Sequence, residues 1–368
     1  MTGIHHMTEK KGNGVALFTK DYIPRVIFWE LTEGCNLKCI HCRATAQPIR
    51  ANDELTTEQA FKVIDQISKL GNPIVILTGG EPLYRPDFFE IANYANTKGL
   101  TLAMASNGTL INSNIAKSIK QSGIRRVAIS FDGPNASIHD QFRGLPGSFE
   151  DAIRGAKAVQ DQGIELQFNT TITKHNVNKI EQMLQLAQTH NVHALHLFML
   201  VPVGCGVEIV ENNMLTAEEY ENVLGWFYDR SREVDFEIRA TCAPHYYRIM
   251  REKAKENGER ITRNSHGMAA VTKGCLAGTG VFFLSHKGKV RPCGYLPLEA
   301  GDILKQPLQD IWDYSPLFQT LRNNEMLEGK CAICEYVNVC SGCRARAYYE
   351  TGNMMTDEPY CTYEPNRL

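Results

Sequence analysis

Short apolar runs alternate with longer amphipathic stretches between residues 26 and 200. The runs are rich in β-branched residues and too short for helices, whereas the stretches between them have helical length and apolar spacing. Such alternation is typical of repeated β/α units around a parallel sheet. We therefore predict six strands, at residues 26–31, 74–77, 101–105, 126–130, 165–170 and 194–199.

Capping residues indicate where some of the helices begin. Thr56, with Gln59 three residues later, predicts a capping box, and Thr216 with Glu219 predicts another. Asp87, directly after a proline, is a further candidate cap. These positions fit helices that connect or follow the predicted strands.

Six β/α units are too few to close an eight-stranded barrel, so the pattern predicts a partial barrel of the α/β class. In such folds the functional loops follow the carboxyl ends of the strands. The segments there are Glu-Gly-Cys at 33–35, Gly-Gly-Glu-Pro at 79–82, Ser-Asn-Gly at 106–108 and Ser-Phe-Asp-Gly at 130–133. We expect one face to collect them.

The chain divides into four predicted parts. Residues 1–20 lack apolar periodicity and read as a flexible tail, and residues 21–215 form the partial barrel. Residues 216–270 read as a polar helical bridge, and residues 271–368 contain most of the cysteines.

The charge and the apolar runs exclude several kinds of partner. The 39 Lys and Arg against 41 Asp and Glu leave no basic excess for a phosphate backbone, so we expect no nucleic-acid partner. The longest apolar stretch, residues 194–207, is broken by His196, Pro202 and two glycines and is shorter than the roughly 18 residues of a membrane span. With no secretory h-region either, a cytoplasmic location without membrane contact is expected.

The 12 cysteines are distributed unevenly. In a reducing compartment a cysteine-rich chain more often holds metal than disulfides. Cys205 and Cys242 stand alone, whereas the others form an early group of three and a late group of seven: Cys35, Cys39 and Cys42, then Cys275, Cys293, Cys331, Cys334, Cys340, Cys343 and Cys361.

The early group supplies three thiolates from one loop with the spacing CxxxCxxC. Closed iron-sulfur and structural zinc sites use four ligands, so an open metal position is implied. In a 4Fe-4S cluster, the fourth iron would be free to bind a substrate or cofactor. A zinc site completed by His41, or a coincidental grouping, is the alternative.

This spacing after a first strand resembles the radical S-adenosylmethionine (SAM) superfamily. The resemblance implies that the three cysteines hold a 4Fe-4S cluster whose free iron binds SAM, which is cleaved to a 5′-deoxyadenosyl radical. Gly79, Gly80 and Glu81 resemble the motif that meets the SAM amino group, although Gly-Gly-Glu-Pro alone would be an ordinary turn. A glycine pair permits close backbone approach, and an ammonium group needs acceptors.

Further SAM contacts are implied at the next two strand ends. Asn107 and Ser130, with Asp132 less certainly, occupy positions where members of the superfamily contact the ribose and carboxylate, though each is also a common turn residue. Many members carry an aromatic residue before the third cysteine, where this chain has His41. An imidazole can still stack on adenine.

The late cysteines contain two CxxC pairs separated by only five residues, too close for an ordinary zinc ribbon. The arrangement resembles the SPASM extension, which carries auxiliary 4Fe-4S clusters, although its last gap is usually one residue longer. The resemblance implies one cluster on Cys331, Cys334, Cys340 and Cys361. It implies a second on Cys275, Cys293 and Cys343, with one ligand missing.

Cys242 and His245 are candidates for that ligand or for a ligand of a substrate iron. An imidazole is a familiar axial ligand of porphyrin iron. The alternative is that the cysteine is buried as a small apolar residue and the histidine caps a helix.

Residues 239–248 and 265–268 resemble the tetrapyrrole-modifying branch of the superfamily, and most of all the Fe-coproporphyrin III decarboxylases that make heme b. The resemblance implies an iron-porphyrin substrate, two propionates converted to vinyl groups, and a low-potential electron donor such as ferredoxin or flavodoxin. Arg239, Arg248 and Arg263 are candidate propionate partners. A sister tetrapyrrole step, a SPASM peptide maturase and a non-catalytic electron carrier remain alternatives.

Overall fold

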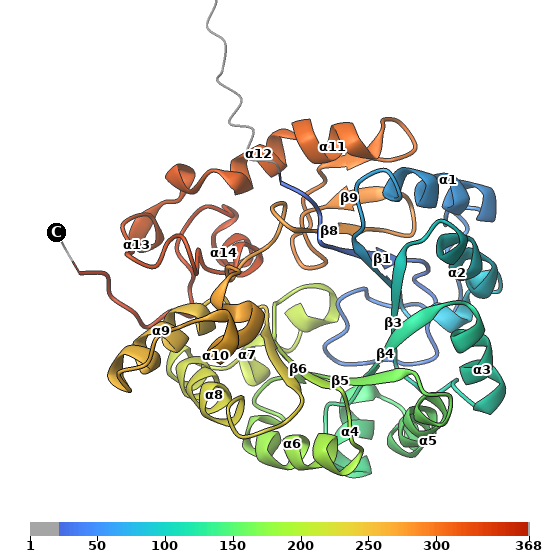
Figure 1. The fold of residues 1–368 in the computed structure, drawn as a ribbon, viewed down its shortest axis with the longest axis horizontal. Coiled ribbons are helices and arrows are strands. Elements are labelled where there is room, and N and C mark those ends of the chain that lie inside the picture. The colour runs from blue at the N-terminus through green and yellow to red at the C-terminus, as the bar shows by residue number, and fades with distance from the viewer. Residues whose placement is uncertain (1–21, 367–368) are drawn as a thin grey trace, which may run out of the picture.

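The computed structural model of the chain describes residues 22–366 (Figure 1). The tail predicted at residues 1–20 lies outside the described residues. A single ten-stranded sheet organises the described part, in the order β10-β9-β8-β1-β2-β3-β4-β5-β6-β7.

The six predicted strands are all present, and their ends match the prediction to within two residues. Neighbours among them run parallel, as expected for β/α units. They are β1 (Val26–Glu30), β2 (Ile74–Thr78), β3 (Thr101–Ser106), β4 (Ile124–Ser130), β5 (Glu165–Ile172) and β6 (Ala194–Met199).

Four further strands extend this sheet at its two edges. β7 (Glu237–Thr241) runs parallel to β6, and β8 (Val281–Leu284) runs parallel to β1. The antiparallel β9 (Lys289–Arg291) and β10 (Gly301–Asp302) complete the sheet beyond β8. The prediction of a purely helical bridge at 216–270 is therefore wrong at β7, whose half-exposed edge position gives it little of the apolar pattern of a buried strand.

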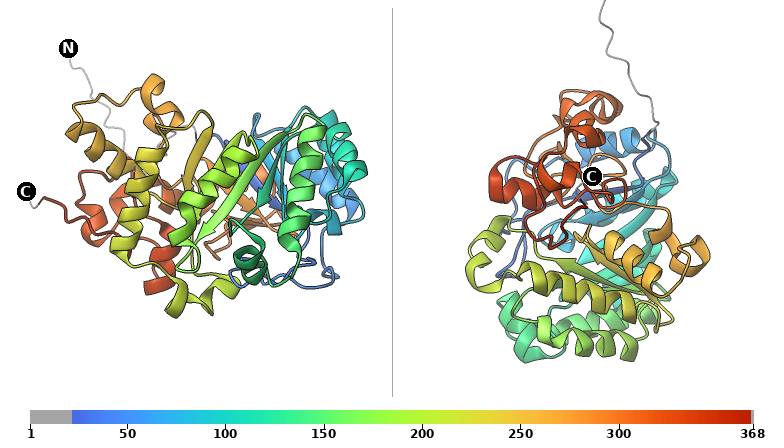
Figure 2. Two further views of the ribbon diagram at one scale, coloured as in Figure 1. Left: turned by 90° about the horizontal axis from the view of Figure 1, so that it is seen from below. Right: turned by 90° about the vertical axis from the view of Figure 1, so that its left-hand side faces the viewer.

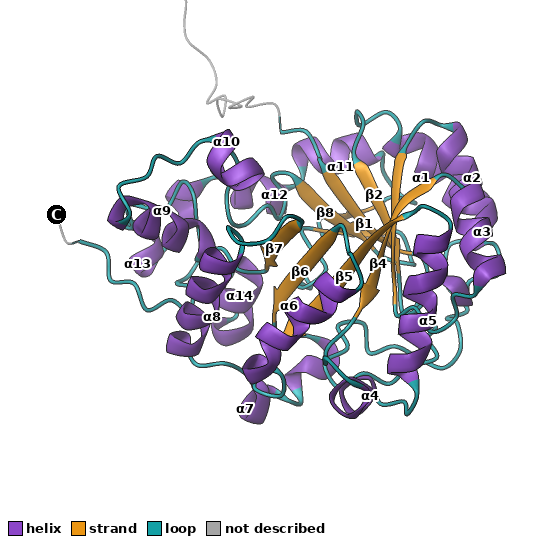
Figure 3. Cartoon of the chain, turned by 60° about the horizontal axis from the view of Figure 1, so that its bottom comes forward, coloured by secondary structure: helices purple, strands orange, loops and turns teal. Residues whose placement is uncertain are grey.

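Helices cover the outer side of the sheet, and the strands surround the interior (Figures 1 and 3). Those between the first six strands are α1 (Thr57–Ile67), α2 (Phe88–Thr97), α3 (Ser113–Gln121), α4 (Ala136–Arg143), α5 (Ser148–Asp161) and α6 (Ile180–Thr189). The later ones are α7 (Val210–Asn213), α8 (Ala217–Arg230), α9 (Tyr246–Glu256), α10 (Arg263–His266), α11 (Leu308–Tyr314), α12 (Pro316–Arg322), α13 (Gly329–Ala332) and α14 (Arg344–Thr351). None of the helices in the described residues is long and apolar enough to cross a membrane.

Both predicted capping boxes are present. The Thr56 side chain accepts from the Gln59 backbone N–H, and the Gln59 side chain accepts from the Thr56 backbone N–H. Thr216 and Glu219 form the same pair of bonds at the start of α8. Asp87 precedes α2 but makes no capping hydrogen bond, because its carboxylate pairs with Arg85 at 2.9 Å and accepts from the Thr57 hydroxyl at 2.7 Å. Asp87 therefore marked the start of α2 correctly, but its side chain bonds to other residues instead of capping the helix.

Most of the buried apolar residues form one core between the sheet and its helices, with fully buried members such as Ile27 and Phe168. A second, smaller apolar cluster lies in the C-terminal part around Leu296, Cys343 and Met355. Helices α13 and α14 lie at the end of the molecule occupied by α8 and α9, whereas α11 lies against α1 (Figures 1 and 2). The cysteine-rich part thus joins the barrel both through β8 and at this end.

Candidate functional site

The loop after β1 carries the three early cysteines. Cys35 is buried, and its N–H donates to the Gln47 carbonyl at 2.7 Å. The Cys42 N–H donates to the Cys39 carbonyl at 3.1 Å, which turns the loop back on itself. Burial raises the pKa of Cys35 to about 12, and the nearby Cys39 and Cys42 thiolates raise it too. Three mutually close thiols therefore share one site, where a bound cation would favour their thiolate forms.

The glycine pair after β2 allows the next loop to lie directly against this cysteine loop. The Gly80 N–H donates to the Thr32 carbonyl, and the Glu81 N–H donates to the Gly34 carbonyl, both at 2.8 Å. A Cβ atom would lie 2.6 Å from the Thr32 oxygen at Gly79 and 2.4 Å from the Gly34 oxygen at Gly80. Larger residues would force the two loops apart.

Glu81 is fully buried and joins the β2 loop to the β3 loop. Its carboxylate accepts from the Ser106 hydroxyl at 2.9 Å and from the Asn107 N–H at 2.8 Å. Burial raises its pKa to about 7, against hydrogen bonds that lower it. Glu81 thus links the β2 loop to the β3 loop inside the protein. Its contact with the SAM amino group stays a prediction.

Asn107 lies beside the cysteine loop. Its amide nitrogen is 3.9 Å from the Cys35 Sγ and donates to the Asn36 Oδ1 at 2.8 Å. Its amide oxygen accepts from the Thr109 N–H at 2.9 Å. Ser130 ends β4 at the same edge of the sheet. The four predicted loops therefore do meet at the carboxyl ends of the strands.

Arg143, the last residue of α4, was not identified from the sequence. Its guanidinium is 3.6 Å from the Cys39 Sγ and forms an ion pair with the fully buried Asp132. Asp132 also accepts from the Thr171 N–H at 2.7 Å. A buried cation thus stands beside the three thiols, where it offsets their negative charge. The only sequence signal was Asp132 at the strand end.

His41 stacks on Phe142, with ring centroids 4.3 Å apart and 26° between the planes. Burial lowers its pKa well below the usual value, with the Arg143 charge acting in the same direction. A neutral, aromatic ring therefore stands where an aromatic residue was expected. Its stacking on adenine stays a prediction.

A polar row crosses the inner side of the sheet. Ser130 pairs in register with Asn169, Asn169 with His196, and His196 with Arg239, so their side chains share one face. The Gln167 amide donates to the Asn169 Oδ1 at 2.7 Å and lies 3.0 Å from the His196 Nδ1. The sequence analysis identified only Ser130 and Arg239, the two ends of this row. Asn169 and His196 lie inside predicted strands, where no motif marks them.

The late cysteines form two groups, as predicted. Four of them line one cavity on the C-terminal part: Cys331, Cys334, Cys340 and Cys361. In the second group, Cys275 and Cys343 raise the pKa of Cys293, after the larger effect of burial. Cys242 lies near the same three thiols. Their roles as ligands stay predictions.

An ion pair between Arg346 and Glu358 lies between the two groups. Both side chains are almost fully buried, and Nε and Oε1 are 2.9 Å apart. The carboxylate accepts from the Cys343 N–H, and the Glu358 N–H lies 3.4 Å from the Cys331 Sγ. Although burial acts to raise the pKa of Glu358, the Arg346 charge holds it at about 2. Sequence reasoning missed both residues.

His245 separates from Cys242 in the structure. It is buried, lines the cavity of the first late group, and lies 4.0 Å from the Glu358 carboxylate. Neither ring nitrogen has a hydrogen-bond partner among the described residues, and burial lowers its pKa to about 4. His245 therefore faces the four-cysteine cavity.

The three arginines predicted to bind propionates differ in burial and in their partners. Arg248 is buried and bonded to Glu221 at 2.6 Å and to Glu252 at 2.5 Å, so its guanidinium is committed to protein carboxylates. Its role toward a propionate stays a prediction. Arg239 is exposed and pairs with Glu237 at 2.6 Å. Arg263 lies in the short α10, and its role is untested.

The early and late cysteines are joined through Arg43, which follows Cys42. Its guanidinium pairs with the buried Glu30, donates to the Gly294 carbonyl at 3.4 Å and lies 4.6 Å from the centre of the Phe283 ring. Burial acts to raise the pKa of Glu30, but Arg43 and His286 lower it to about 2. Arg43 thus links the first cysteine loop to β8 and to the residue that follows Cys293.

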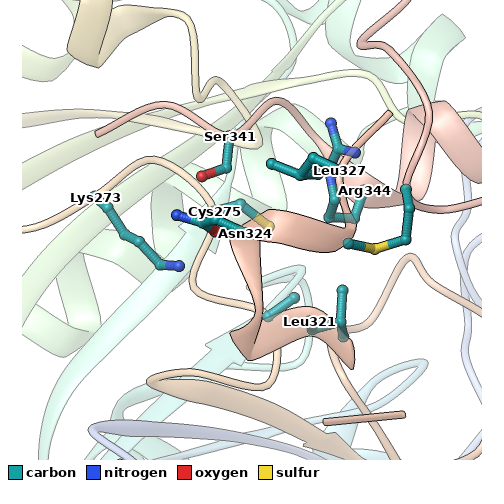
Figure 4. Close-up of a pocket in the computed structure, with 9 residues that line it drawn as sticks. Lys273, Cys275, Leu321, Asn324, Leu327, Ser341 and Arg344 are labelled. Carbon is teal, nitrogen blue, oxygen red and sulfur yellow. The ribbon is translucent and has the colours of Figure 1, made fainter. Parts of the chain in front are cut away.

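A small cavity adjoins the second late group. Cys275 and Ser341 line it together with Arg344 and the apolar Leu321 and Leu327 (Figure 4). Within residues 22–366, no three or more His, Cys, Asp or Glu residues are arranged to hold a single metal ion.

Two parts of the chain match known families. Residues 29–187 match the family described as the radical SAM superfamily, and residues 275–344 match SPASM, described as an iron-sulfur cluster-binding domain. The second match contains six of the seven late cysteines, since only Cys361 lies beyond it.

Among curated proteins, the chain is 48% identical to the AdoMet-dependent heme synthase of Methanosarcina barkeri, over 94% of this chain and 98% of that protein. The enzyme of the same name from Nitratidesulfovibrio vulgaris is 46% identical, over 94% of each chain. The Fe-coproporphyrin III synthase of Methanosarcina barkeri is 33% identical, over 94% of this chain and 89% of that protein.

Among solved structures, SuiB of Streptococcus suis bound to S-adenosylmethionine superposes with a TM-score of 0.74 at 16% identity, over 93% of this chain and 78% of that one. At this identity, the likeness shows the fold. The predicted α/β partial barrel with a C-terminal iron-sulfur domain is thereby confirmed.

Proposed function

This chain belongs to the radical SAM superfamily and carries a C-terminal SPASM domain, and we propose that it converts two propionates of Fe-coproporphyrin III to vinyl groups, giving heme b. As a member, it is an enzyme that uses SAM and 4Fe-4S clusters. The proposed part is the substrate and the step. Each propionate would lose one β-hydrogen atom, one carbon dioxide and one electron.

The donor sets fit the groups that this reaction needs. Cys35, Cys39 and Cys42 would hold the SAM-binding cluster, since they provide three close thiols and leave a fourth position open. The late cysteines would hold the auxiliary clusters in the two groups described above. When bound, these groups supply a 5′-deoxyadenosyl radical at the first site and an acceptor for the released electron at the auxiliary sites.

The protein's own residues would bind and orient the reactants. Gly79 and Gly80 hold the β2 loop against the cysteine loop, where backbone groups can meet SAM. The row from Ser130 to Arg239 offers hydroxyl, amide, imidazole and guanidinium groups on the inner face of the sheet. Such groups can fix the direction of SAM and of a carboxylate-bearing substrate. Enclosure within the sheet would exclude water from a radical.

The observation that carries the proposal is the similarity to AdoMet-dependent heme synthases over nearly the whole chain, cysteine-rich part included. A relative named Fe-coproporphyrin III synthase is less similar, at 33% identity, and its name states the compound that we propose as substrate here. A sister step on another tetrapyrrole is therefore the second candidate. The low-potential donor, such as ferredoxin or flavodoxin, and a cytoplasmic location belong to the same proposal.

The test is an anaerobic incubation of reconstituted protein with Fe-coproporphyrin III, SAM and dithionite, followed by mass spectrometry. We expect heme b, with one 5′-deoxyadenosine for each vinyl group formed. The Cys35→Ala variant is the control for radical formation. SAM cleavage without any change in the porphyrin would reject the substrate, and an absence of SAM cleavage by reduced protein would favour an electron carrier.

A further inference from the structure

Cys242 occupies an unusual backbone position directly after β7. Its φ of 55° lies in the left-handed region, which non-glycine residues rarely adopt. The Cys242 carbonyl accepts from Arg346 Nη1 at 2.7 Å, and the Arg346 Nε pairs with the Glu358 Oε1 at 2.9 Å. A buried ion pair therefore holds the cysteine in a strained conformation, which is typical of functional positions.

The Cys242 side chain belongs to the same small apolar region as two other cysteines. Cys242 and Cys293 both lie against the apolar cluster that contains the buried Cys343. The three come from segments far apart in the sequence: the end of β7, the loop after β9 and the start of α14. Only the tertiary fold brings them together.

The backbone next to Cys275 lies close to the segment that follows Cys242, because residue 274 is a glycine. A Cβ atom at Gly274 would lie 2.6 Å from the Pro244 Cα and 2.8 Å from the Cys340 carbonyl oxygen. The Gly274 N–H also donates to the Val339 carbonyl at 2.8 Å. Gly274 thus allows the backbone before Cys275 to press against the segment that follows Cys242.

We propose that Cys242 is the fourth protein ligand of the auxiliary iron-sulfur cluster that Cys275, Cys293 and Cys343 would hold. The inference deepens the proposed function, on which it rests for the presence of that cluster. The seven cysteines of residues 275–361 are one short of the eight that two four-cysteine clusters need. Cys242 supplies the missing thiol from outside the SPASM match at 275–344.

The four thiols lie close enough to interact electrostatically. Burial raises the pKa of Cys242 well above its usual value, and the nearby Cys343, Cys293 and Cys275 thiolates raise it further, against Arg346. An iron-sulfur cluster bound among these four side chains would hold them as thiolates.

Closure by Cys242 gives this cluster a different role from that of the SAM-binding one. With four thiolates it has no open iron, so it can pass electrons but cannot bind a substrate carboxylate directly. His245 is not needed as a ligand, since it faces the other cavity, whose four cysteines are already a complete set.

The experiment uses the full-length chain with Cys35, Cys39 and Cys42 replaced by alanine, so that only auxiliary clusters remain. This parent should bind about eight irons after anaerobic reconstitution. Cys242→Ala is then added, and Cys205→Ala is the matched control. The Cys205 N–H donates to the Cys42 carbonyl at 2.9 Å, so the control removes a thiol beside the early loop. The readouts are iron content and electron paramagnetic resonance (EPR) in the oxidised and dithionite-reduced states.

We expect Cys242→Ala to lose one to four of the roughly eight irons and to alter the EPR of one auxiliary cluster, with a three-iron signal in the oxidised state if one iron leaves. Cys205→Ala should keep the iron and the spectrum of the parent. Unchanged iron and EPR in Cys242→Ala would overturn the proposal. If circular dichroism shows that the alanine variant is unfolded, Cys242→Ser carries the test, because an oxygen ligand should keep the cluster and shift its EPR, and an unshifted spectrum rejects the ligand.

These outcomes are separate from those of the proposed function. The spectra need neither SAM nor porphyrin, so a different substrate would leave this result unchanged. Decarboxylation by the full enzyme could equally be found with a Cys242 that is not a ligand.

Discussion

The partial barrel at residues 22–215 and the cysteine-rich part at 271–366 are built in different ways. The barrel has long parallel strands, regular helices and one continuous apolar core. In the cysteine-rich part, no strand or helix among the described residues exceeds eight residues, the apolar cluster is small, and a buried ion pair lies between two cysteine groups. Apolar burial can organise the first, whereas the second needs polar contacts and the groups that its thiols would hold.

Two buried glutamates, one in each part, differ in their surroundings. Glu81 in the barrel accepts from the neutral donors of Ser106 and Asn107, and burial raises its pKa to about 7. Glu358 faces the Arg346 guanidinium, and its pKa is held at about 2 despite burial. Glu81 is thus partly protonated near pH 7, whereas Glu358 is firmly ionised, because only Glu358 faces an arginine. Glu30 in the barrel, which pairs with Arg43, behaves like Glu358.

The largest effect should separate the early and late cysteines. Replacing Cys35, Cys39 or Cys42 by alanine should abolish SAM cleavage, because the open iron position is lost. Cys334→Ala should leave some uncoupled cleavage, since that thiolate belongs to another group. Production of 5′-deoxyadenosine measures both. Equal and complete loss in all four variants, with circular dichroism showing an intact fold, would contradict the division.

Iron removal should distinguish the two parts by their stability. We expect chelation of the reconstituted enzyme to speed hydrogen exchange strongly at residues 320–366 and only weakly in strands β2 to β6, because metal binding couples to folding where the apolar core is small. Hydrogen–deuterium exchange with mass spectrometry checks this. Uniform loss of protection across the barrel would make the contrast wrong.

The two glutamates should respond differently to neutralisation. Glu358→Gln leaves the buried Arg346 without a counter-charge and should cost about 3–5 kcal/mol of unfolding free energy. Glu81→Gln, at a carboxyl already partly protonated near pH 7, should cost clearly less. Denaturant unfolding at pH 7 compares them, and a Glu81→Gln cost as large as that of Glu358→Gln would contradict the electrostatic argument.

Their pH dependences should also have opposite signs. The folded pKa of Glu358 is about 2, below the usual 4.5, so its stabilisation is present above about pH 4.5 and is lost as the pH falls toward 2. The folded pKa of Glu81 is about 7, above 4.5, so its stabilisation is present below about pH 4.5 and is lost as the pH rises through 7. Unfolding curves of the wild type and the two variants across this range test both slopes.

The smallest effect should come from a helix cap in the barrel. Thr56→Ala removes the capping box of α1 and should cost about 1 kcal/mol, because one backbone N–H loses its acceptor. The cysteine groups lie elsewhere, so iron content should stay unchanged. Thermal unfolding and an iron assay together check the prediction, and a loss of iron would show that the two parts are coupled more tightly than we infer.

Sequence reasoning located the six central strands because each is a short run with apolar residues between stretches of helical length. It missed β7, whose residues are only half-buried at a sheet edge, and it had no basis for placing β8 beside β1. Which strands form the two edges of the sheet depends on tertiary contacts. Local periodicity carries no information about these contacts.

For the candidate site, the sequence by itself determined the chemistry. The CxxxCxxC spacing, the glycine pair and the seven late cysteines are local or compositional signals, because ligand types and close backbone approaches depend on residue identity. They were sufficient to indicate a metal site with an open position, and their resemblance to the radical SAM superfamily implied SAM and iron-sulfur clusters.

Only the tertiary structure decided which groups share a site. Arg143 lies beside Cys39, and Arg248 bonds to two glutamates. His245 lines the cavity of Cys331, Cys334, Cys340 and Cys361, whereas Cys242 lies near Cys275, Cys293 and Cys343. Charge pairing and burial act through space, so neighbouring positions in the chain, three residues apart, can serve different cysteine groups. Cys242 also has a left-handed backbone conformation directly after β7, which no local pattern predicts.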